Sequence, residues 1–195
     1  MNALPEGLRF SLNPGHLLGR SCFALGLRTF DEAARHVEAL TYSRPTGGDV
    51  AAVLTEGAGT CSSKHRFLAQ LAHENGRHEI CLTVGIYMME ERNTPGVGLT
   101  LAAAGLDSLP EAHCYLALDG YRHDFTGLAR GEAAPLESLV SEYQVTPAAL
   151  PAFKVREHRR FLSDWALRKG LDPDTVWRIR EACIAALVAR VPASG

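Results

Sequence analysis

The chain has 195 residues, of which 46% are hydrophobic and 22% are charged, and this balance excludes disordered and fibrous proteins. A net charge of -2 argues against wholesale nucleic-acid binding, and no apolar run approaches the roughly 18 residues of a membrane span. Length and composition therefore predict a single globular domain, residues 1–195, with a core large enough to enclose a dry active site.

The first residues and the cysteines both bear on the compartment. The N-terminal segment lacks the basic and then apolar signature of a secretion signal. The number of cysteines is odd and no Cys-x-x-Cys pair occurs, so we expect reduced thiols and a cytoplasmic location. The five cysteines are Cys22, Cys61, Cys81, Cys114 and Cys183.

The N-terminal part is predicted to be helical after an irregular start. Residues 1–28 carry scattered Pro and Gly, and we expect them to be irregular. The sequence TFDE at 29–32 is a capping box, which predicts a helix with an apolar face through about Leu40. Residues 49–56 predict a second, short helix, which ends at the permissive glycines of 57–59.

A third helix and a strand are predicted in the middle of the chain. The helix runs from Cys61 to about Asn75, with Gly76 as its C-terminal cap. Residues 79–89 are β-branched and alternate in polarity, which indicates a strand. The polar segment that follows, up to Leu109, is expected to be a loop with one short helix.

A hairpin is predicted next, because Asp119-Gly120 stands between two strand-like runs. Beyond Thr126 the pattern predicts helices, one over residues 155–170 and a last one that opens with Asp172-Pro173. The apolar stripe of the first is Phe161, Leu162, Trp165 and Ala166. The apolar face of the second is Val176, Cys183, Ile184, Leu187, Val188 and Val191.

Cys61 is the candidate nucleophile. A catalytic cysteine reacts as its thiolate, and both a helix N-terminus and a neighbouring His⁺ lower the pKa of a thiol. Cys61 lies in the first turn of its predicted helix, directly after the GAGT turn, where its own N–H is expected to point toward an oxyanion on a bound carbonyl. The competing interpretation of a lone cysteine is a small buried hydrophobe.

The hairpin supplies a histidine and a carboxylate. In the register of a two-residue loop, His113 faces Thr126, and Asp124 lies diagonal to His113 on the same face, about 7 to 8 Å away at the backbone. We therefore expect Asp124 to orient His113, and His113 to take the proton of Cys61 and deliver it to the leaving group.

The opposite face of the hairpin is expected to be a core face, which leaves the face of His113 and Asp124 to address the cysteine helix. His123 falls on this apolar face and is interpreted as a core or rim histidine. The other members of the face are Cys114, Leu116, Leu118, Tyr121 and Phe125.

Two segments, GTCSSKHRFLAQLAHENG at 59–76 and EAHCYLALDGYRHDFTG at 111–127, together resemble the transglutaminase-like superfamily. The resemblance places Cys61, His113 and Asp124 on the three catalytic positions of that family. It implies an α+β, papain-like fold with the cysteine-bearing helix packed on an antiparallel sheet. It also implies thiol chemistry on amides or esters, with neither cofactor nor metal.

The resemblance further implies a catalytic core at 29–130 and a helical extension at 131–195 that packs on it. Residues 152–195 hold nine Lys/Arg against five Asp/Glu, which we interpret as a solvated helical surface. The expected partners are small-molecule, peptide or protein amides and esters, with no nucleic acid and no membrane. The sequence leaves open hydrolysis versus acyl transfer, and also the oligomeric state.

A second oxyanion donor would come from outside the predicted triad. Tyr42, Ser43 and Thr46 lie upstream, and Thr60 directly precedes the cysteine. We take Tyr42, Ser43 and Thr60 as the candidate oxyanion-stabilising or substrate-binding residues.

Three alternatives remain at the level of sequence. One is a binding module that keeps the fold without the chemistry. Another is arylamine acetyl transfer with coenzyme A, although the Arg-Gly-Gly-x-Cys pattern of such enzymes is missing. The last is a zinc site, because zinc takes thiolate, imidazole and carboxylate ligands. Its candidate ligands are Cys61 and His65 on one helix and His113, Cys114, His123 and Asp124 in the hairpin.

Overall fold

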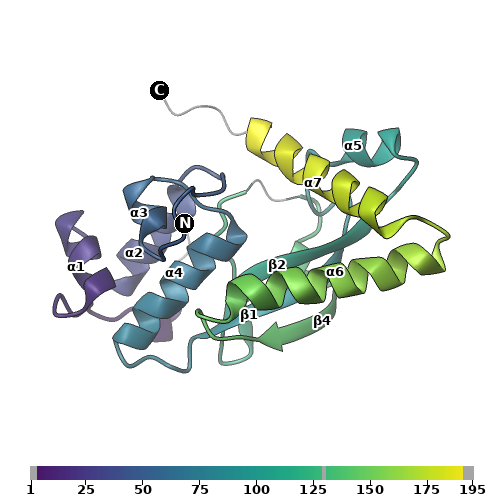
Figure 1. The fold of residues 1–195 in the computed structure, drawn as a ribbon. Helices are drawn as coiled ribbons and strands as arrows, with labels where there is room; N and C mark the ends of the chain where they lie inside the picture. The colour runs from purple at the N-terminus through teal and green to yellow at the C-terminus, as the bar shows by residue number, and fades with distance from the viewer. Residues whose placement is uncertain (1–3, 129–130, 191–195) are drawn as a thin grey trace. The chain divides into compact units, whose positions relative to one another are not determined.

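Helices and strands are mixed along the chain, which confirms the predicted α+β class (Figure 1). The computed structural model describes residues 4–128 and 131–190. Its α-helices are α1 (Leu17–Ala24), α2 (Phe30–Ala39), α3 (Ala52–Thr55), α4 (Cys61–Glu74), α5 (Gly98–Ala103), α6 (Leu150–Arg168) and α7 (Pro173–Arg190). Its strands are β1 (Cys81–Met89), β2 (Leu109–Leu118), β3 (Tyr121–His123) and β4 (Leu139–Gln144), and they form a sheet in the order β3-β2-β1-β4.

The chain divides into two units. The first comprises Met1–Thr83, Cys114–Gly127 and Gln144–Pro147, and the second comprises Val84–His113, Leu128–Tyr143 and Ala148–Gly195. The division cuts β1 after Thr83 and β2 before Cys114, so each unit holds part of both strands.

Helix α4 is the central helix of the first unit, in contact with α1, α2 and α3 (Figure 1). The predicted capping box starts α2: the Thr29 N–H donates to Glu32 Oε2 at 3.0 Å, and the Glu32 N–H donates to Thr29 Oγ1 at 3.4 Å. The apolar face of α2 is completely buried, which is why this helix lies against α4. Its members are Phe30, Ala33, Ala34 and Val37.

The irregular start that the sequence predicts is wrong in one place, because residues 17–24 form α1. This helix buries Leu18 and Cys22, and the Leu18 N–H donates to Glu74 Oε2 near the end of α4 at 3.1 Å. A short helix of this length has little stability of its own, so packing on α4 is what makes it helical.

The predicted hairpin is confirmed through its turn and first pairs. Leu118 pairs with Tyr121 in antiparallel register, and Asp119 and Gly120 both have positive φ, at 50° and 79°. The strand nevertheless ends at His123, earlier than the predicted register requires. The chain leaves the ladder there because the next backbone N–H groups donate to side chains, as described below.

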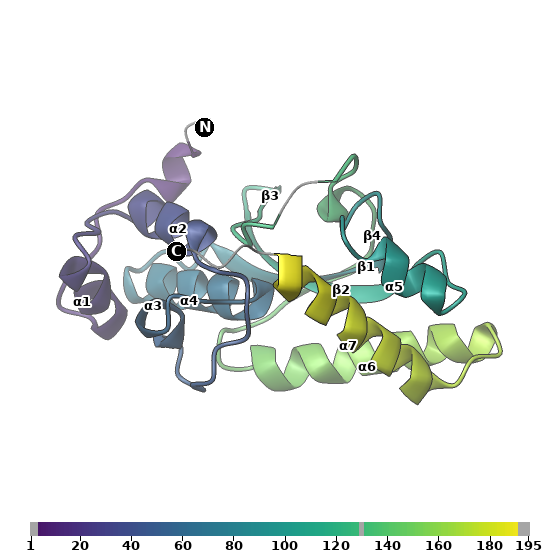
Figure 2. The same cartoon turned by 90° about the horizontal axis from the view of Figure 1, so that it is seen from above.

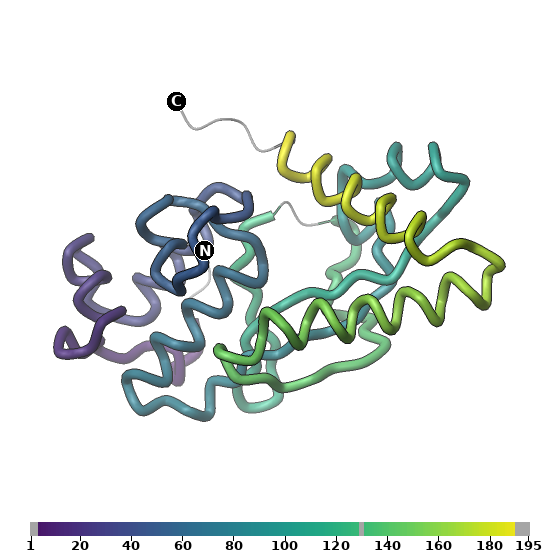
Figure 3. The backbone as a smooth tube through the Cα atoms, viewed as in Figure 1, coloured from purple at the N-terminus to yellow at the C-terminus, as the bar shows by residue number. Residues whose placement is uncertain are grey.

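The second unit contains α6 and α7, which lie side by side (Figures 2 and 3). Leu162 and Ala166 of α6 and Val176 of α7 form a buried cluster, with Trp165 and Trp177 packed partly buried against it. The predicted cap of α7 is confirmed, because Asp172 Oδ2 accepts from the N–H and hydroxyl of Thr175 at 2.8 and 2.6 Å. Val191, the last residue of the predicted α7 face, lies outside the described residues.

Two predictions for this unit are corrected. The chain beyond Thr126 does not turn directly to helix, because residues 139–144 form β4, whose side chains alternate between half-buried and exposed. That alternation is the period of a half-buried strand. Helix α6 also begins at Leu150, five residues before the predicted start, with Pro151 in its first turn.

Helix α7 is tied to β2 by a buried ion pair within this unit. Both guanidinium nitrogens Nε and Nη2 of Arg180 donate to the carboxylate of Glu111, at 2.6 and 2.7 Å. His158 of α6 lies beside the pair, with its Nε2 2.9 Å from the carbonyl oxygen of Pro110. Among the described residues, no helix is both long and apolar enough to cross a membrane.

Candidate functional site

Cys61 is the first residue of α4, as the sequence predicts, and only 5% of it is exposed. The helix start is fixed by Ser63, whose Oγ accepts from the Thr60 N–H at 2.9 Å. The N-terminal end of a helix carries partial positive charge and unpaired N–H groups, which favour a thiolate and an oxyanion. The position of Cys61 therefore suits a nucleophilic thiol.

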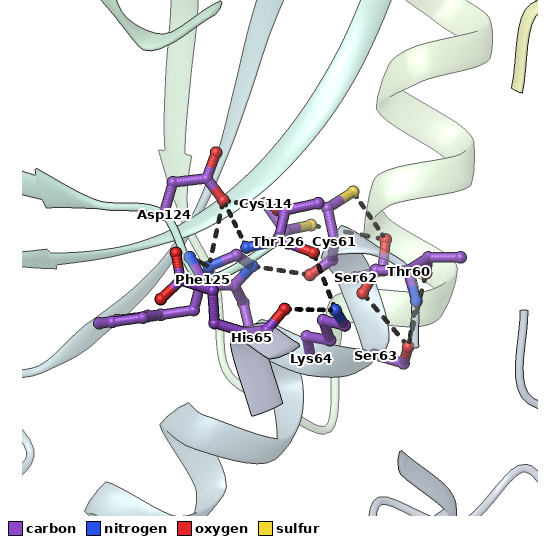
Figure 4. A network of polar contacts seen from close by, with 11 residues as sticks. Thr60, Cys61, Ser62, Ser63, Lys64, His65, Cys114, Asp124, Phe125 and Thr126 are labelled. Carbon is purple, nitrogen blue, oxygen red and sulfur yellow. Dashed lines mark hydrogen bonds and ion pairs between the residues drawn. The ribbon is translucent and has the colours of Figure 1, made fainter. Parts of the chain in front are cut away.

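A second cysteine lies at the same helix start. The hydroxyl of Ser62 is 3.9 Å from Cys61 Sγ and 3.6 Å from Cys114 Sγ, so it contacts both sulfur atoms (Figure 4). Cys114 is completely buried, in agreement with a packing role. Its burial agrees with the predicted core face, and Cys114 also contacts the first turn of α4.

Asp124 lies just beyond β3, in a tight local turn rather than in the strand. Its Oδ1 accepts from the N–H of Thr126 at 2.9 Å and from the Thr126 hydroxyl at 2.5 Å. This arrangement is an Asx-type turn, which competes with strand pairing for the backbone donor. The turn fixes one carboxylate oxygen of Asp124 close to α4.

His65, one turn after Cys61, holds this turn against the helix. Its Nδ1 is 2.8 Å from the carbonyl oxygen of Cys61, and its Nε2 accepts from the Phe125 N–H at 2.8 Å (Figure 4). These partners assign the proton to Nδ1, because a carbonyl can only accept. Both ring nitrogens are thus engaged, so His65 is a structural histidine and a poor candidate for the base that activates Cys61.

Lys64 is fully buried next to His65. Its ammonium group donates to three main-chain carbonyl oxygens, those of Glu38 at 3.2 Å, Leu40 at 2.7 Å and Thr126 at 2.8 Å. Burial lowers the pKa of Lys64 to about 8, and the charges of Glu38, Asp124 and Cys61 act in the opposite direction. Lys64 is not among the residues predicted from the sequence. A lysine in register with Phe67, Leu68 and Leu71 on the apolar stripe of α4 was the available signal.

The upstream segment with the candidate oxyanion donors lies beside the turn that precedes Cys61. Thr41 forms a bridge with Ala58, and its carbonyl oxygen accepts from the Gly59 N–H at 2.9 Å. Tyr42 and Ser43 follow directly, so the fold brings them near the start of α4, with Tyr42 only 6% exposed.

Thr60, the remaining candidate, and Thr46 both have local structural roles. The backbone N–H of Thr60 is used in the cap of α4. The N–H and the hydroxyl of Thr46 both donate to Glu56, at 2.8 and 3.1 Å, so Thr46 closes its own loop.

His113 belongs to the second unit, where it is 8% exposed on β2. The ring of Tyr87 meets it edge-on with centroids 6.3 Å apart, and the Tyr87 hydroxyl lies 2.9 Å from Thr94 Oγ1. This buried polar contact fixes Tyr87 and, through it, one side of the imidazole. The predicted pairing of His113 with Cys61 and Asp124 stays a prediction.

His123 is one of the candidate zinc ligands. His123 is half-buried, its Nε2 has no hydrogen-bond partner among the described residues, and burial lowers its pKa. No group of three or more His, Cys, Asp or Glu side chains placed to hold a metal occurs in residues 4–128 and 131–190.

Comparison of the chain with family models, with curated proteins and with solved structures found no match. The function is therefore inferred from the residues of the site themselves.

Proposed function

We propose that the protein is a thiol-dependent hydrolase or acyltransferase, which acts on an amide or ester through an acyl-enzyme at Cys61. In this proposal His113 is the general base and acid, and Asp124 orients it. The observation that carries the proposal is the position of Cys61 at the first residue of α4, with the carboxylate turn of Asp124 fastened to the next turn of the same helix.

The chemistry follows from these positions. The thiolate of Cys61 attacks the carbonyl carbon, and the N–H groups at the start of α4 donate to the oxyanion that develops. His113 gives its proton to the departing amine or alcohol as the tetrahedral intermediate collapses to a thioester. Water or another acceptor, deprotonated by His113, then attacks the thioester and frees the thiolate.

We also propose the finer fold, a papain-like core in which the cysteine helix lies against the sheet. Its support is the contact between Ser62 of α4 and Cys114 of β2, together with the confirmed β2–β3 hairpin. In such a fold the histidine and the carboxylate come from neighbouring strands; here His113 lies on β2 and Asp124 directly follows β3.

The choice of His113 is supported by the exclusion of His65 as the base. His65 lies on the same helix as Cys61, and its Nε2 is 3.6 Å from Asp124 Oδ1. With its proton on Nδ1 and Nε2 occupied by the Phe125 N–H, its ring has no lone pair left to receive the proton of a thiol.

The test uses p-nitrophenyl acetate, an activated ester that does not depend on the natural substrate. We expect the wild-type protein to release p-nitrophenol and to gain one acetyl group on the peptide that contains Cys61. Cys61→Ala should lower the rate by at least about 1000-fold with the fold intact, because the nucleophile is gone. Asp124→Asn should leave a weaker enzyme, because the imidazole loses its orienting partner.

Cys114→Ala is the matched control, since Cys114 contacts the same Ser62 hydroxyl but has a packing role. It should retain the activity and the acetyl group on Cys61. Activity that survives Cys61→Ala and disappears in Cys114→Ala would show that the nucleophile is the other cysteine. A folded wild-type protein that is never acetylated on Cys61 would favour a binding module without chemistry.

A further inference from the structure

The first two turns of α4 hold two separate segments of the first unit through buried polar side chains. Lys64 reaches the C-terminal end of α2 at Glu38 and Leu40, and it reaches the Asp124 turn at the carbonyl of Thr126. His65 holds the same turn through the Phe125 N–H. Figure 4 shows both side chains converging on the Asp124–Thr126 segment.

Gly127 shows how closely these segments meet. A Cβ atom at this position would lie 2.0 Å from the carbonyl oxygen of Glu38 and 3.5 Å from Lys64 Nζ, and its φ of +75° is unfavourable for other residues. The chain after Asp124 therefore runs against the end of α2 at a distance that only glycine permits, with the ammonium group beside it.

A buried cation is a costly way to bond three carbonyl groups. Removing an ammonium group from water costs several kcal/mol, and its three acceptors here are neutral oxygens rather than a carboxylate. A neutral amide could supply donors without that cost. The positive charge is therefore what distinguishes a lysine from a neutral donor at this position.

Lys64 follows Cys61 by three residues on α4, and three groups that act as anions lie within its electrostatic reach, namely Glu38, Asp124 and the Cys61 thiolate. A fixed positive charge favours each of them in its ionised form, and the low local dielectric strengthens the effect. The thiolate is the form of cysteine that attacks a carbonyl.

We propose that Lys64 is a positioning residue of this site: with His65 it clamps the Asp124 turn onto α4, and its charge stabilises the thiolate of Cys61. The positioning role rests on the proposed function. The electrostatic coupling between Lys64 and Cys61, however, exists whether or not a substrate is turned over.

The coupling can be measured in the full chain by NMR of lysine Cε, because the sequence holds only three lysines, Lys64, Lys154 and Lys169. We expect Lys64 to titrate near pH 8. In Cys61→Ser the thiolate is absent, so the midpoint of Lys64 should fall further, by about half a pH unit or more, while those of Lys154 and Lys169 stay unchanged. Cys81→Ser is the control and should leave all three unchanged. An equal midpoint in wild type and Cys61→Ser would overturn the proposal.

The reciprocal measurement follows the alkylation of Cys61 by iodoacetamide against pH, with the modified peptide identified by mass. Lys64→Gln replaces the ammonium group with an amide, which still has N–H donors but no charge. The pH inflection of Cys61 alkylation should therefore rise by about one pH unit. Lys169→Met should leave it in place. If Lys64 were purely structural, Lys64→Gln would change the free energy of unfolding but would leave the pH inflection of Cys61 alkylation unchanged in the folded variant. If Lys64→Gln does not fold, the NMR comparison decides alone.

These outcomes are separable from those of the ester assay. If Lys64 and Cys61 are coupled but Cys61 is not acetylated, the positioning role of Lys64 stands and the proposed hydrolase is rejected. If Cys61 is acetylated but the two residues are not coupled, the proposed hydrolase stands and the positioning role is rejected.

Discussion

At the scale of single residues, the site depends on the environment that burial creates around a few polar groups. Lys64 and His65 are both completely buried, yet each is paired by main-chain atoms from a segment distant in sequence. Such buried polar groups are tolerated in the folded state when every hydrogen-bond partner is present, and the loss of one partner lowers the stability of the fold. The residue before them, Ser63, caps the helix.

The stability of the fold should respond sharply to Lys64. Lys64→Met leaves the carbonyls of Glu38, Leu40 and Thr126 without their donor, and we expect unfolding by urea to show a loss of about 3 kcal/mol. Lys169→Met, at an exposed position, should change the free energy of unfolding by less than about 0.5 kcal/mol. A loss in Lys64→Met no larger than that in the control would show that water replaces the lysine without cost.

At the scale of elements, the β2–β3 hairpin sets where Asp124 emerges. Its turn needs two consecutive residues with positive φ, and Asp119-Gly120 meets that need. The strand then stops after three residues because the Asp124 and His65 side chains take the next backbone N–H groups. A short strand thus ends where the candidate site begins.

Gly120 should be important for its backbone conformation alone. A Cβ there would meet nothing within 4 Å, but the φ of +79° strains any other residue. We expect Gly120→Ala to lower the free energy of unfolding by about 1 kcal/mol. Gly48→Ala is the matched control, because it also has open space and lacks the positive φ, so it should be neutral or slightly stabilising. Equal effects of the two substitutions in thermal unfolding would contradict the assigned turn.

At the scale of the whole chain, each of the two units has buried charged groups among its described residues. In the second unit, burial by itself raises the pKa of Glu111, but the charges of Arg180 and His158 hold it below its usual range. His158 and the Arg180 guanidinium both lie against the Trp177 ring, at 5.2 and 5.4 Å. This cluster connects α6 and α7 to β2, so it should control how the whole protein responds to acid.

The pH dependence follows from His158. Burial lowers its pKa, with Glu111 acting in the opposite direction, so below pH 6.5 the unfolded chain binds more protons at this position than the folded protein. The stability that the neutral imidazole supplies is present above pH 6.5 and declines as the pH falls. His158→Gln should therefore lose less stability between pH 6.5 and 5 than wild type, by about 1 kcal/mol. The exposed control His16→Gln should follow wild type in the same urea titrations. If the free energy of unfolding falls with pH equally steeply in wild type and in His158→Gln, His158 is not the source of the acid sensitivity.

The sequence by itself determined the features that are encoded within a few residues of each other. The capping box at Thr29, the start of α4 at Cys61, the Asp119-Gly120 turn and the cap at Asp172 all depend on local hydrogen bonds or on φ, and the structure confirms each. The sequence does not predict strand β4, because its pattern is taken up in a region predicted to be helical. It does not predict helix α1, because this helix becomes stable only by packing on α4.

Only the tertiary structure decided which distant groups meet at the site. Spacing along the chain cannot show that Lys64 bonds the end of α2, that His65 receives the Phe125 N–H, or that Cys114 shares a hydroxyl with Cys61. The physical reason is that these contacts join segments 24 to 60 residues apart, and only the packing of α4 decides which buried donor reaches which acceptor.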